Sequence, residues 1–444
     1  MVTRTEPGSQ GIDCCACGRV HNAPIDTVVI DDNAVEHLVA YTVVRKWSRP
    51  FVVMDANTAD VAGSRVIDAL SSANMTVSTF CFPERKGLLA DESNVARLEG
   101  ALKQVEADSL FSVGSGVITD LTRYVATRSG REFVSVPTAA SMDGYASAVA
   151  AMEFEGVKTS FVSKAPVAIF AEPQTIAAAP RDMTRAGIGD LLGKASARTD
   201  WVASHALYGE YLCPIVEQSV TDSYMDAATN VGDILAGSPK VAARFLNGLV
   251  QSGIAIALVG NSRPASGCEH QVSHFWDLLA ASGRRPHEPH GLQVGYATHF
   301  AMALQSYAFG GKMGELVEPR TVGPESDEAL LLFAGHEAQV EKVMAERSDF
   351  LAEHGSTFPT TPAGWESARG QIAAAMGVFP LVAEALSTAG IPPEPGFLGF
   401  DEETLKKSFR WANRIRPRYS VLDFLEGQDR LEEAIEVVLQ TSRA

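Results

Sequence analysis

Short runs of apolar, mostly β-branched residues alternate with helical stretches from the N-terminus to Asp182. Runs of this length are typical of buried strands, and the stretches between them are long enough to cross from one parallel strand to the next. The pattern therefore predicts an α/β domain with a mostly parallel, doubly wound sheet. The predicted strands are Thr27–Ile30, Pro50–Asp55, Thr76–Phe82, Leu110–Gly114, Glu132–Pro137 and Val167–Glu172. The predicted helices between them include Ala34–Trp47, Glu92–Ala107 and Val117–Arg128.

The pattern changes after Pro180, where strand-like runs become rare and long segments rich in Ala and Leu follow. Their length and apolar spacing favour helices. We therefore predict two domains, an α/β domain at residues 1–182 and an all-helical domain at residues 183–444. The predicted helices of the second domain include Ala186–Tyr208, Val241–Gly260, Val294–Ser306, Glu328–Ala345 and Leu431–Gln440.

The composition suits two globular domains, because 46% of the 444 residues are hydrophobic and 20% are charged. The formal net charge is −17. Such a charge repels phosphate backbones and anionic lipid, so nucleic acid and membrane surfaces are not expected partners. It also means that any anionic cofactor has to be held by local donors.

Targeting signals and a disulfide framework are not expected. No apolar run is expected to span a bilayer, and Met1–Asp13 lacks the apolar stretch of a secretory signal. Six cysteines in a chain of this length do not form a disulfide framework. Cys81 and Cys213 lie in apolar runs and are expected to be reduced core thiols. We therefore expect a cytoplasmic enzyme.

A glycine-rich turn at Gly114-Ser115-Gly116 follows a predicted strand and opens a predicted helix. Glycines let the backbone approach a pyrophosphate, and a helix N-terminus offers free N–H groups and the positive end of its dipole. These backbone donors are the kind that an acidic chain needs for an anionic cofactor. An ordinary tight turn between strand and helix is the alternative interpretation.

The segment Val136–Ser147 follows the next strand and is dense in small and hydroxyl residues. Such a loop at the carboxyl edge of a sheet is typical of a ligand site. Asp143 is its single charged residue, and Thr138 lies near its start. A turn or a helix cap formed by the Asp143 side chain is the alternative interpretation.

Two separate segments carry candidate metal ligands. Asp190 lies among glycines and leucines, where a buried carboxylate needs a partner, a proton or a metal; a helix-start cap is the alternative. His270 and His274 are four residues apart and would share one face of a helix, and His290 opens the next helical stretch. Together these residues can supply a histidine–carboxylate metal site with an open position.

Two further groups of residues carry weaker predictions. Cys14, Cys15, Cys17 and His21 form a tight N-terminal cluster, but zinc sites usually need a second pair of ligands, so we expect a flexible segment more than a structural zinc or redox site. The basic residues next to the candidate motifs are either surface charges or ligands of a substrate phosphate. They are Lys158, Lys164, Lys194 and Arg263.

These motifs, in this order, resemble the sn-glycerol-1-phosphate dehydrogenase family. That family belongs to a superfamily with the iron-containing alcohol dehydrogenases, the glycerol dehydrogenases and dehydroquinate synthase. The resemblance covers most of the chain, including the N-terminal cysteine-rich piece. The segments that carry it are Phe111–Tyr124, Ser135–Ser147, Lys164–Glu172, Ala186–Trp201, Ser262–Trp276 and Arg414–Leu425.

The resemblance implies a nucleotide-binding N-terminal domain, a helical metal-binding domain and a role for each candidate residue. It implies that Gly114, Ser115 and Gly116 hold the pyrophosphate of NAD, or of NADP, and that Thr138 and Ser147 lie near the nicotinamide. It implies that Asp143 contacts substrate hydroxyls, and that a divalent metal, zinc or nickel, is held by Asp190, His270 and His290. His274 shares a face with His270 and is the candidate for a proton relay.

The same resemblance implies the substrate and the state of assembly. The substrate would be a small phosphorylated polyol, with dihydroxyacetone phosphate reduced to sn-glycerol-1-phosphate, and the protein would be a homodimer or a larger homo-oligomer. Asp55 would lie by the adenosine ribose, where its charge favours NAD over NADP. Two residues depart from the family pattern: Cys268 stands where serine is usual, and Arg123 where lysine is common.

Three alternatives stay open at this point. A sibling dehydrogenase would act on another polyol, phosphonate or ketone. A cyclase like dehydroquinate synthase would use NAD and metal without net redox change. A non-catalytic binding protein would have lost one or more of Asp190, His270 and His290, all of which are present here.

Overall fold

The computed structural model describes residues 11–14, 17–22, 25–154, 157–311 and 327–442. The chain divides into two compact units. The first comprises Met1–Leu191 and Asn230–Asn261, and the second comprises Leu192–Thr229 and Ser262–Ala444. Helix α7 (Arg181–Tyr208) contributes residues to both units.

The first unit is built on a six-stranded parallel sheet, which confirms the predicted fold class. The strand order is β3-β10-β7-β6-β4-β5. The order of the chain reverses at β4, because β5 pairs with one side of β4 and β6 with the other. Ligands of open α/β sheets bind at the carboxyl ends of the strands at such a reversal. The strands are β3 (Thr27–Ile30), β4 (Pro50–Asp55), β5 (Ser78–Phe82), β6 (Ser109–Gly114), β7 (Glu132–Pro137) and β10 (Ala168–Ala171).

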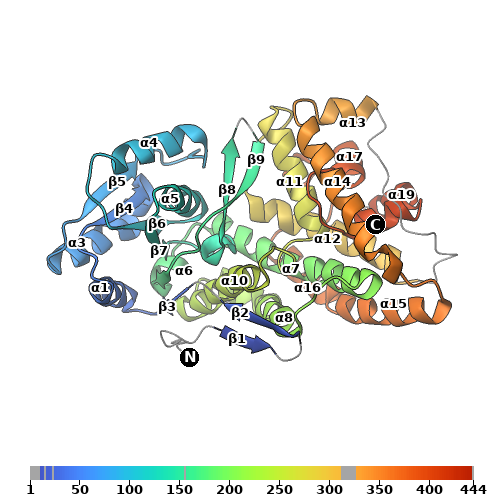
Figure 1. The fold of residues 1–444 in the computed structure, drawn as a ribbon, viewed down its shortest axis with the longest axis horizontal. Helices are drawn as coiled ribbons and strands as arrows, with labels where there is room; N and C mark the ends of the chain where they lie inside the picture. Colours follow the sequence, from blue (N-terminus) through green and yellow to red (C-terminus); the bar gives the residue numbers. More distant parts are fainter. Residues whose placement is uncertain (1–10, 15–16, 23–24, 155–156, 312–326, 443–444) are drawn as a thin grey trace. The chain divides into compact units, whose positions relative to one another are not determined.

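Helices cover both faces of this sheet, because successive side chains of a strand point to opposite faces. Phe51 and Val53 pack into the core formed with α4 and α5, whereas Val52 and Met54 pack into the core formed with α1 and α3 (Figure 1). The continuous apolar run of β4 is therefore buried twice, as in a doubly wound sheet. The helices of this unit are α1 (Ala34–Val44), α2 (Ala56–Thr58), η1 (Ala59–Gly63), α3 (Ser64–Ser72), α4 (Glu92–Leu102), α5 (Gly116–Arg128), η2 (Gly144–Ala146), α6 (Pro173–Ala177), α9 (Val231–Leu235) and α10 (Pro239–Val259).

Two antiparallel hairpins that the sequence pattern did not predict complete this unit. Strands β1 (Gly11–Cys14) and β2 (Arg19–Asn22) form one, and β8 (Val149–Phe154) and β9 (Val157–Val162) form the other. The rings of Phe154 and Phe161 lie against Tyr124 of α5, with centroids 5.4 and 5.3 Å from its ring. The second hairpin thus covers α5 and supports the loop that precedes it.

The second unit contains helices and no strand among its described residues, as predicted for an all-helical domain. The predicted single helix Glu328–Ala345 is wrong, because Gly335 adopts a left-handed φ of 85° and separates two helices there. The helices are α8 (Pro214–Thr229), α11 (Cys268–Ala281), α12 (His290–Phe309), α13 (Asp327–Leu332), α14 (Glu337–His354), η3 (Gly355–Thr357), α15 (Pro362–Met376), α16 (Phe379–Thr388), η4 (Phe397–Gly399), α17 (Glu402–Trp411), η5 (Ala412–Arg414), α18 (Val421–Gly427) and α19 (Leu431–Thr441).

Two helical stretches, Pro239–Val259 and Pro362–Thr388, are long and apolar enough for a membrane span by length and composition alone. The expectation that no run has that length is therefore wrong. In the structure α10 packs on α6 and η2 within the first unit, and α15 and α16 both pack on α12 within the second. Such contacts are typical of core helices in a globular fold.

Candidate functional site

The turn between β6 and α5 requires glycine at two positions because neighbouring side chains leave no room for a Cβ, and not because the backbone adopts a left-handed φ there. A Cβ added to Gly114 would lie 2.6 Å from Ile118, and one added to Gly116 would lie 3.1 Å from the sulfur of Met142. Ser115 is the N-cap residue of α5, yet its side chain caps no amide. Helix N-termini whose amides are left without a side-chain cap are typical of anion sites.

Asp55 ends β4 beside this turn, at the place where the strand order reverses. Val53 pairs with Ser112, so Asp55 and Gly114, each two residues further on, end neighbouring strands. Oδ1 of Asp55 accepts hydrogen bonds from the amides of Asn57 (2.8 Å) and Thr58 (2.9 Å), and these bonds cap α2. The Asp55 side chain therefore caps α2 and also lies at the edge of the sheet where the strands end.

The Asp143 loop is held by buried side chains on both sides. The fully buried Arg123 donates to the carbonyls of Gly144, Tyr145 (3.2 Å) and Val149 (3.0 Å). The hydroxyl of Tyr145 donates to the carbonyl of Ala139 at 2.6 Å. Burial lowers the pKa of Arg123, and the neighbouring Asp120 opposes that shift. Arg123, one of the two residues that depart from the family pattern, therefore holds the backbone of this loop in place. The sequence pattern does not indicate this role.

Asp143 does not cap the short helix η2 that follows it. Its Oδ2 instead accepts a hydrogen bond from the hydroxyl of Ser252 on α10 at 3.0 Å, and its amide donates to Oδ2 of Asp190 at 3.0 Å. Gly253 permits this contact, because a Cβ there would lie 2.5 Å from the carbonyl of Asp143. The helix-cap alternative for Asp143 is therefore wrong.

Asp190 is buried with 1% of its surface exposed, and it lies well inside α7, which begins at Arg181. The alternative that it starts a helix is therefore also wrong. Gly187 lets α7 approach the Asp143 loop, because a Cβ there would collide with the carbonyl of Ala140. The loop and this turn of α7 form one polar layer of the first unit.

The other two predicted residues of this region are mostly buried. Thr138 is 7% exposed, and its amide donates to the carbonyl of Gly114 at 3.3 Å. Ser147 is 6% exposed, and its hydroxyl accepts from the amide of Val149 at 3.0 Å. Both residues thus hold the backbone of the carboxyl edge in place.

Three imidazoles converge in the second unit. The ring centroids of His270 and His290 are 5.4 Å apart, those of His274 and His290 are 5.4 Å apart, and those of His270 and His274 are 6.2 Å apart. Nδ1 of His270 lies 2.8 Å from Oε1 of the fully buried Glu269. Since a carboxylate accepts, Nδ1 donates, and Nε2 is left as the nitrogen that would bind a metal. This donor set suits a divalent transition metal.

Buried partners support each of these rings. Nδ1 of His290 lies 3.3 Å from the hydroxyl of Ser273, and Nδ1 of His274 lies 3.9 Å from Oδ2 of Asp277. Burial by itself would raise the pKa of Glu269, but the hydrogen bonds from His270 and the Gly267 amide outweigh burial and lower it. The side chains of Glu269, Ser273 and Asp277 therefore support the histidine cluster, and the sequence motif does not indicate this role.

Asp200, on the second-unit part of α7, ties that unit together. Its Oδ1 accepts from the Gln305 amide (2.8 Å) and from the backbone of Val421 (3.0 Å), and its Oδ2 accepts from the backbone of Cys268 (2.7 Å). Burial raises the pKa of Asp200 to about 7, and repulsion by Glu269 adds to the shift. This carboxyl group links α7, α11, α12 and α18 next to the histidines.

The four basic residues predicted to bind phosphate lie in different surroundings. Lys164 is exposed, and its amine donates to the carbonyl of Gly130 at 3.3 Å, beyond the end of α5 and about 20 Å along that helix from Ser115. Lys194 is fully buried. Arg263 is 4% exposed, and its Nε and Nη2 both donate to Glu210, the former at 2.7 Å. The side chain of Lys158 lies outside the described residues.

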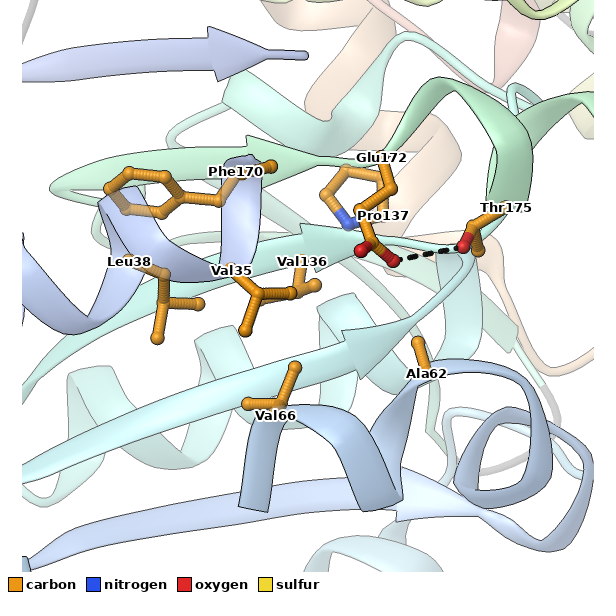
Figure 2. A pocket seen from close by; sticks show the side chains of 10 residues that line it. Val35, Leu38, Ala62, Val66, Val136, Pro137, Phe170, Glu172 and Thr175 are labelled. Carbon is orange, nitrogen blue, oxygen red and sulfur yellow. Dashed lines mark hydrogen bonds between the residues drawn. The ribbon is translucent and has the colours of Figure 1, made fainter. Parts of the chain in front are cut away.

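A separate, small hollow with a volume of about 10 Å³ lies at the carboxyl ends of β7 and β10 in the first unit. Figure 2 shows that its walls are mostly apolar and that Glu172 and Thr175 face one another at its edge. Their side chains are hydrogen-bonded at 3.2 Å, and Arg65 also donates to Glu172. Its polar groups are thus engaged with protein, and the hollow holds none of the predicted site residues.

The N-terminal cysteine cluster is described in part. Cys17 and His21 belong to the β1–β2 hairpin segment, with the sulfur of Cys17 at 3.3 Å from Nε2 of His21. His21 is 3% exposed, and its Nδ1 lies 2.7 Å from the carbonyl of Leu258 on α10. This part of the segment, expected to be flexible, has regular structure. The side chains of Cys14 and Cys15 lie outside the described residues.

Comparison with known proteins groups this chain with one enzyme family. Residues 29–180 match the family model described as iron-containing alcohol dehydrogenase. The chain is 38% identical to the glycerol-1-phosphate dehydrogenase [NAD(P)+] of Halalkalibacterium halodurans, over 65% of this chain and 73% of that protein. It is 30% identical to the enzyme of that name from Geobacillus stearothermophilus, over 93% of this chain and 95% of that protein.

Solved structures agree on the fold. The glycerol dehydrogenase of Schizosaccharomyces pombe superposes with a TM-score of 0.62 at 16% identity, covering 94% of this chain and 89% of that one. An iron-containing alcohol dehydrogenase superposes with a TM-score of 0.62 at 12% identity, covering 95% and 98%. The chain therefore belongs to the glycerol-1-phosphate dehydrogenase family.

Proposed function

We propose that this protein is an NAD(P)-dependent glycerol-1-phosphate dehydrogenase that interconverts dihydroxyacetone phosphate and sn-glycerol-1-phosphate. The observation that carries the proposal is the similarity over 93% of the chain to an enzyme of that name. The histidine cluster and the β6–α5 turn support it, because they offer the metal and the pyrophosphate sites that this chemistry needs.

In this proposal a divalent metal is held by Asp190, His270 and His290, and when bound it supplies Lewis acidity toward the substrate oxygen. Glu269 and Ser273 keep Nε2 of the two imidazoles directed to that role. His274 stands on the same face of α11 as His270 and would relay a proton to or from a substrate hydroxyl.

The nicotinamide cofactor, NAD or NADP, would take up and deliver the hydride. Its pyrophosphate would lie on the backbone of Gly114, Ser115 and Gly116, with Thr138 and Ser147 toward the nicotinamide. Asp55 would lie by the adenosine ribose, where a carboxylate favours NAD over NADP. Asp143 would orient the substrate hydroxyls, since Ser252 fixes the direction of its carboxylate. We place this enzyme in the cytoplasm, as a homodimer or larger homo-oligomer using zinc or nickel.

The test is NADH oxidation by protein loaded separately with zinc and with nickel, over ketose phosphates and unphosphorylated ketones. We expect dihydroxyacetone phosphate to be the best substrate, the product to be the sn-1 enantiomer, and NADH to be preferred over NADPH. Turnover of an unphosphorylated ketone at equal efficiency would instead indicate a sibling polyol dehydrogenase. Tightly held NAD without net NADH consumption would indicate a cyclase.

A further inference from the structure

A short loop of the second unit, Ile415–Ser420, carries two arginines, Arg416 and Arg418. It joins η5 to α18 and lies against the first turns of α11. The Gln271 amide donates to the carbonyls of Arg416 (3.4 Å) and Arg418 (2.9 Å). Nη1 of Arg263 donates to the carbonyl of Tyr419 at 2.6 Å. Two buried side chains therefore hold the backbone of this loop in place.

The guanidinium of Arg263 donates two hydrogen bonds to the carboxylate of Glu210, which compensates its positive charge. Its predicted role as a phosphate ligand is therefore the weaker interpretation. Arg263 instead holds the backbone of Arg418 and its neighbours beside α11.

Arg418 has a different set of partners. Its Nη1 donates to the hydroxyl of Ser266 at 2.5 Å and to the Ser266 carbonyl at 3.4 Å, and its Nη2 donates to the hydroxyl of Ser262. These acceptors are neutral, and within the described ranges no carboxylate forms an ion pair with Arg418. The hydrogen bonds of this half-buried guanidinium therefore go to neutral serine oxygens and not to a carboxylate.

Arg416 places a second positive charge next to the first. Burial lowers the pKa of Arg418 well below its usual range, and repulsion by Arg416 and Arg263 adds to the shift, whereas Glu269 and Glu210 oppose it. Burial also lowers the pKa of Arg416 to about 10, and Asp277 opposes that shift. Bringing these cations together costs free energy that a bound anion would offset. This concentration of positive charge occurs in a chain with a net charge of −17.

The arginines lie beside the histidine-bearing part of α11. Ser266, which accepts hydrogen bonds from Arg418, lies two residues before the start of this helix. Asp277, which interacts with Arg416, is on the same helix face as His270 and His274. An anion held by both guanidiniums would therefore lie along the face that carries the candidate metal ligands.

We propose that Arg416 and Arg418 bind the phosphate group of the substrate. The ligand class is a small phosphomonoester dianion, since two guanidinium forks match phosphate oxygens in charge and geometry. This inference rests on the proposed function for the rest of the substrate, but the anion site can be tested without turnover.

The test uses inorganic phosphate as the probe with the full-length, metal-loaded protein. Arg418→Ala and Arg416→Ala each remove one charge-assisted contact, so calorimetry is expected to show a loss of phosphate affinity of about 10- to 100-fold. Arg418→Lys keeps the charge without the fork and is expected to lose less. Arg410→Ala is the control, because Arg410 is ion-paired with Glu432 and Glu328 on α19 and α13. It is expected to bind phosphate like the wild type.

Kinetics provide the second readout. Arg418→Ala is expected to raise KM for dihydroxyacetone phosphate by a similar factor, whereas the control Arg410→Ala is expected to leave that KM unchanged. Equal phosphate affinity in wild type, Arg416→Ala and Arg418→Lys would overturn the inference even if Arg418→Ala did not fold. Arginine-dependent phosphate binding without reduction of dihydroxyacetone phosphate would leave the anion site standing and refute the proposed function. Reduction of dihydroxyacetone phosphate with an unchanged KM in the arginine variants would refute the anion site and leave the proposed function standing.

Discussion

The two units present their candidate functional groups in different ways. In the first unit, the β6–α5 turn offers backbone amides, and neighbours such as Ile118 and Met142 leave no room for a side chain at Gly114 or Gly116. In the second unit, the candidate groups are histidine and arginine side chains, and buried partners orient His270, His290 and Arg418 among them. A backbone site depends on shape, whereas a side-chain site depends on a layer of supporting polar groups.

This comparison predicts which substitutions matter most. Removing a side chain from the second unit should abolish one function and leave the sheet folded. Adding a side chain to the first unit should disturb both folding and binding.

The largest effect is expected from His270→Ala. Loss of a metal ligand removes several kcal/mol of charge stabilisation, so bound metal should disappear and turnover should fall at least about 1,000-fold. NADH binding, measured by fluorescence, should persist, because the β6–α5 turn is untouched. His37→Ala is the control, since His37 faces Asp31 on the first unit. Full metal occupancy in His270→Ala would refute the ligand set.

The next effect concerns the group beneath His270. Glu269→Gln cannot accept the Nδ1 proton as a carboxylate does, so metal affinity is expected to fall about 10- to 100-fold. Ser273→Ala should cost less, because its contact with His290 is longer, at 3.3 Å, and neutral. Competition with a chelator measures both. Unchanged metal affinity in Glu269→Gln would show that Glu269 serves only the packing of α11.

Gly114→Ala tests the backbone site. Its Cβ would lie 2.6 Å from Ile118, so the fold has to shift at a cost of about 1–3 kcal/mol. We expect a lower melting temperature and about 10-fold weaker NADH binding, with metal content retained. Gly100→Ala in α4 is the matched control, because nothing lies within 4 Å of the added Cβ, and it should stabilise slightly. Normal NADH affinity in Gly114→Ala would argue against the turn as the pyrophosphate site.

The smallest effect is a pH dependence centred on Asp200. Its pKa is raised to about 7 from 3.8, so the folded protein holds this proton where the unfolded chain has released it. The free energy of unfolding contributed by this group is full below pH 4 and is lost as the pH rises toward 7, by at most about 1.4 kcal/mol per pH unit. In the wild type we expect the melting temperature to fall by a few degrees between pH 5 and 7, and Asp200→Asn should abolish this decrease. A wild-type slope that persists in the variant would exclude Asp200 as its source.

Some features of this protein could be predicted from local sequence. Strands β4 and β7 match their predicted bounds, because continuous apolar runs between helical segments leave few alternatives. Helix α1 ends three residues before the predicted Trp47, since Lys46 adopts a left-handed φ of 59° that the apolar pattern does not reveal. The sequence pattern does not predict the β8–β9 hairpin, because Phe154 and Phe161 of this hairpin pack on Tyr124 of α5, a contact between segments that are distant in the sequence.

The sequence by itself determined the doubly wound sheet, the helical second half, the glycine turn and the residue types of the candidate metal ligands, because periodicity and short motifs are local properties. Only the tertiary structure decided which charges are already compensated. Arg263 and Arg418 look alike in the sequence, yet one is paired with Glu210 and the other bonds to serines. The effect of a charge on a ligand depends on every charge around it. The partners of these two arginines come from the segments after α7 and before α11, and Glu210 lies more than 200 residues before Arg418 in the chain.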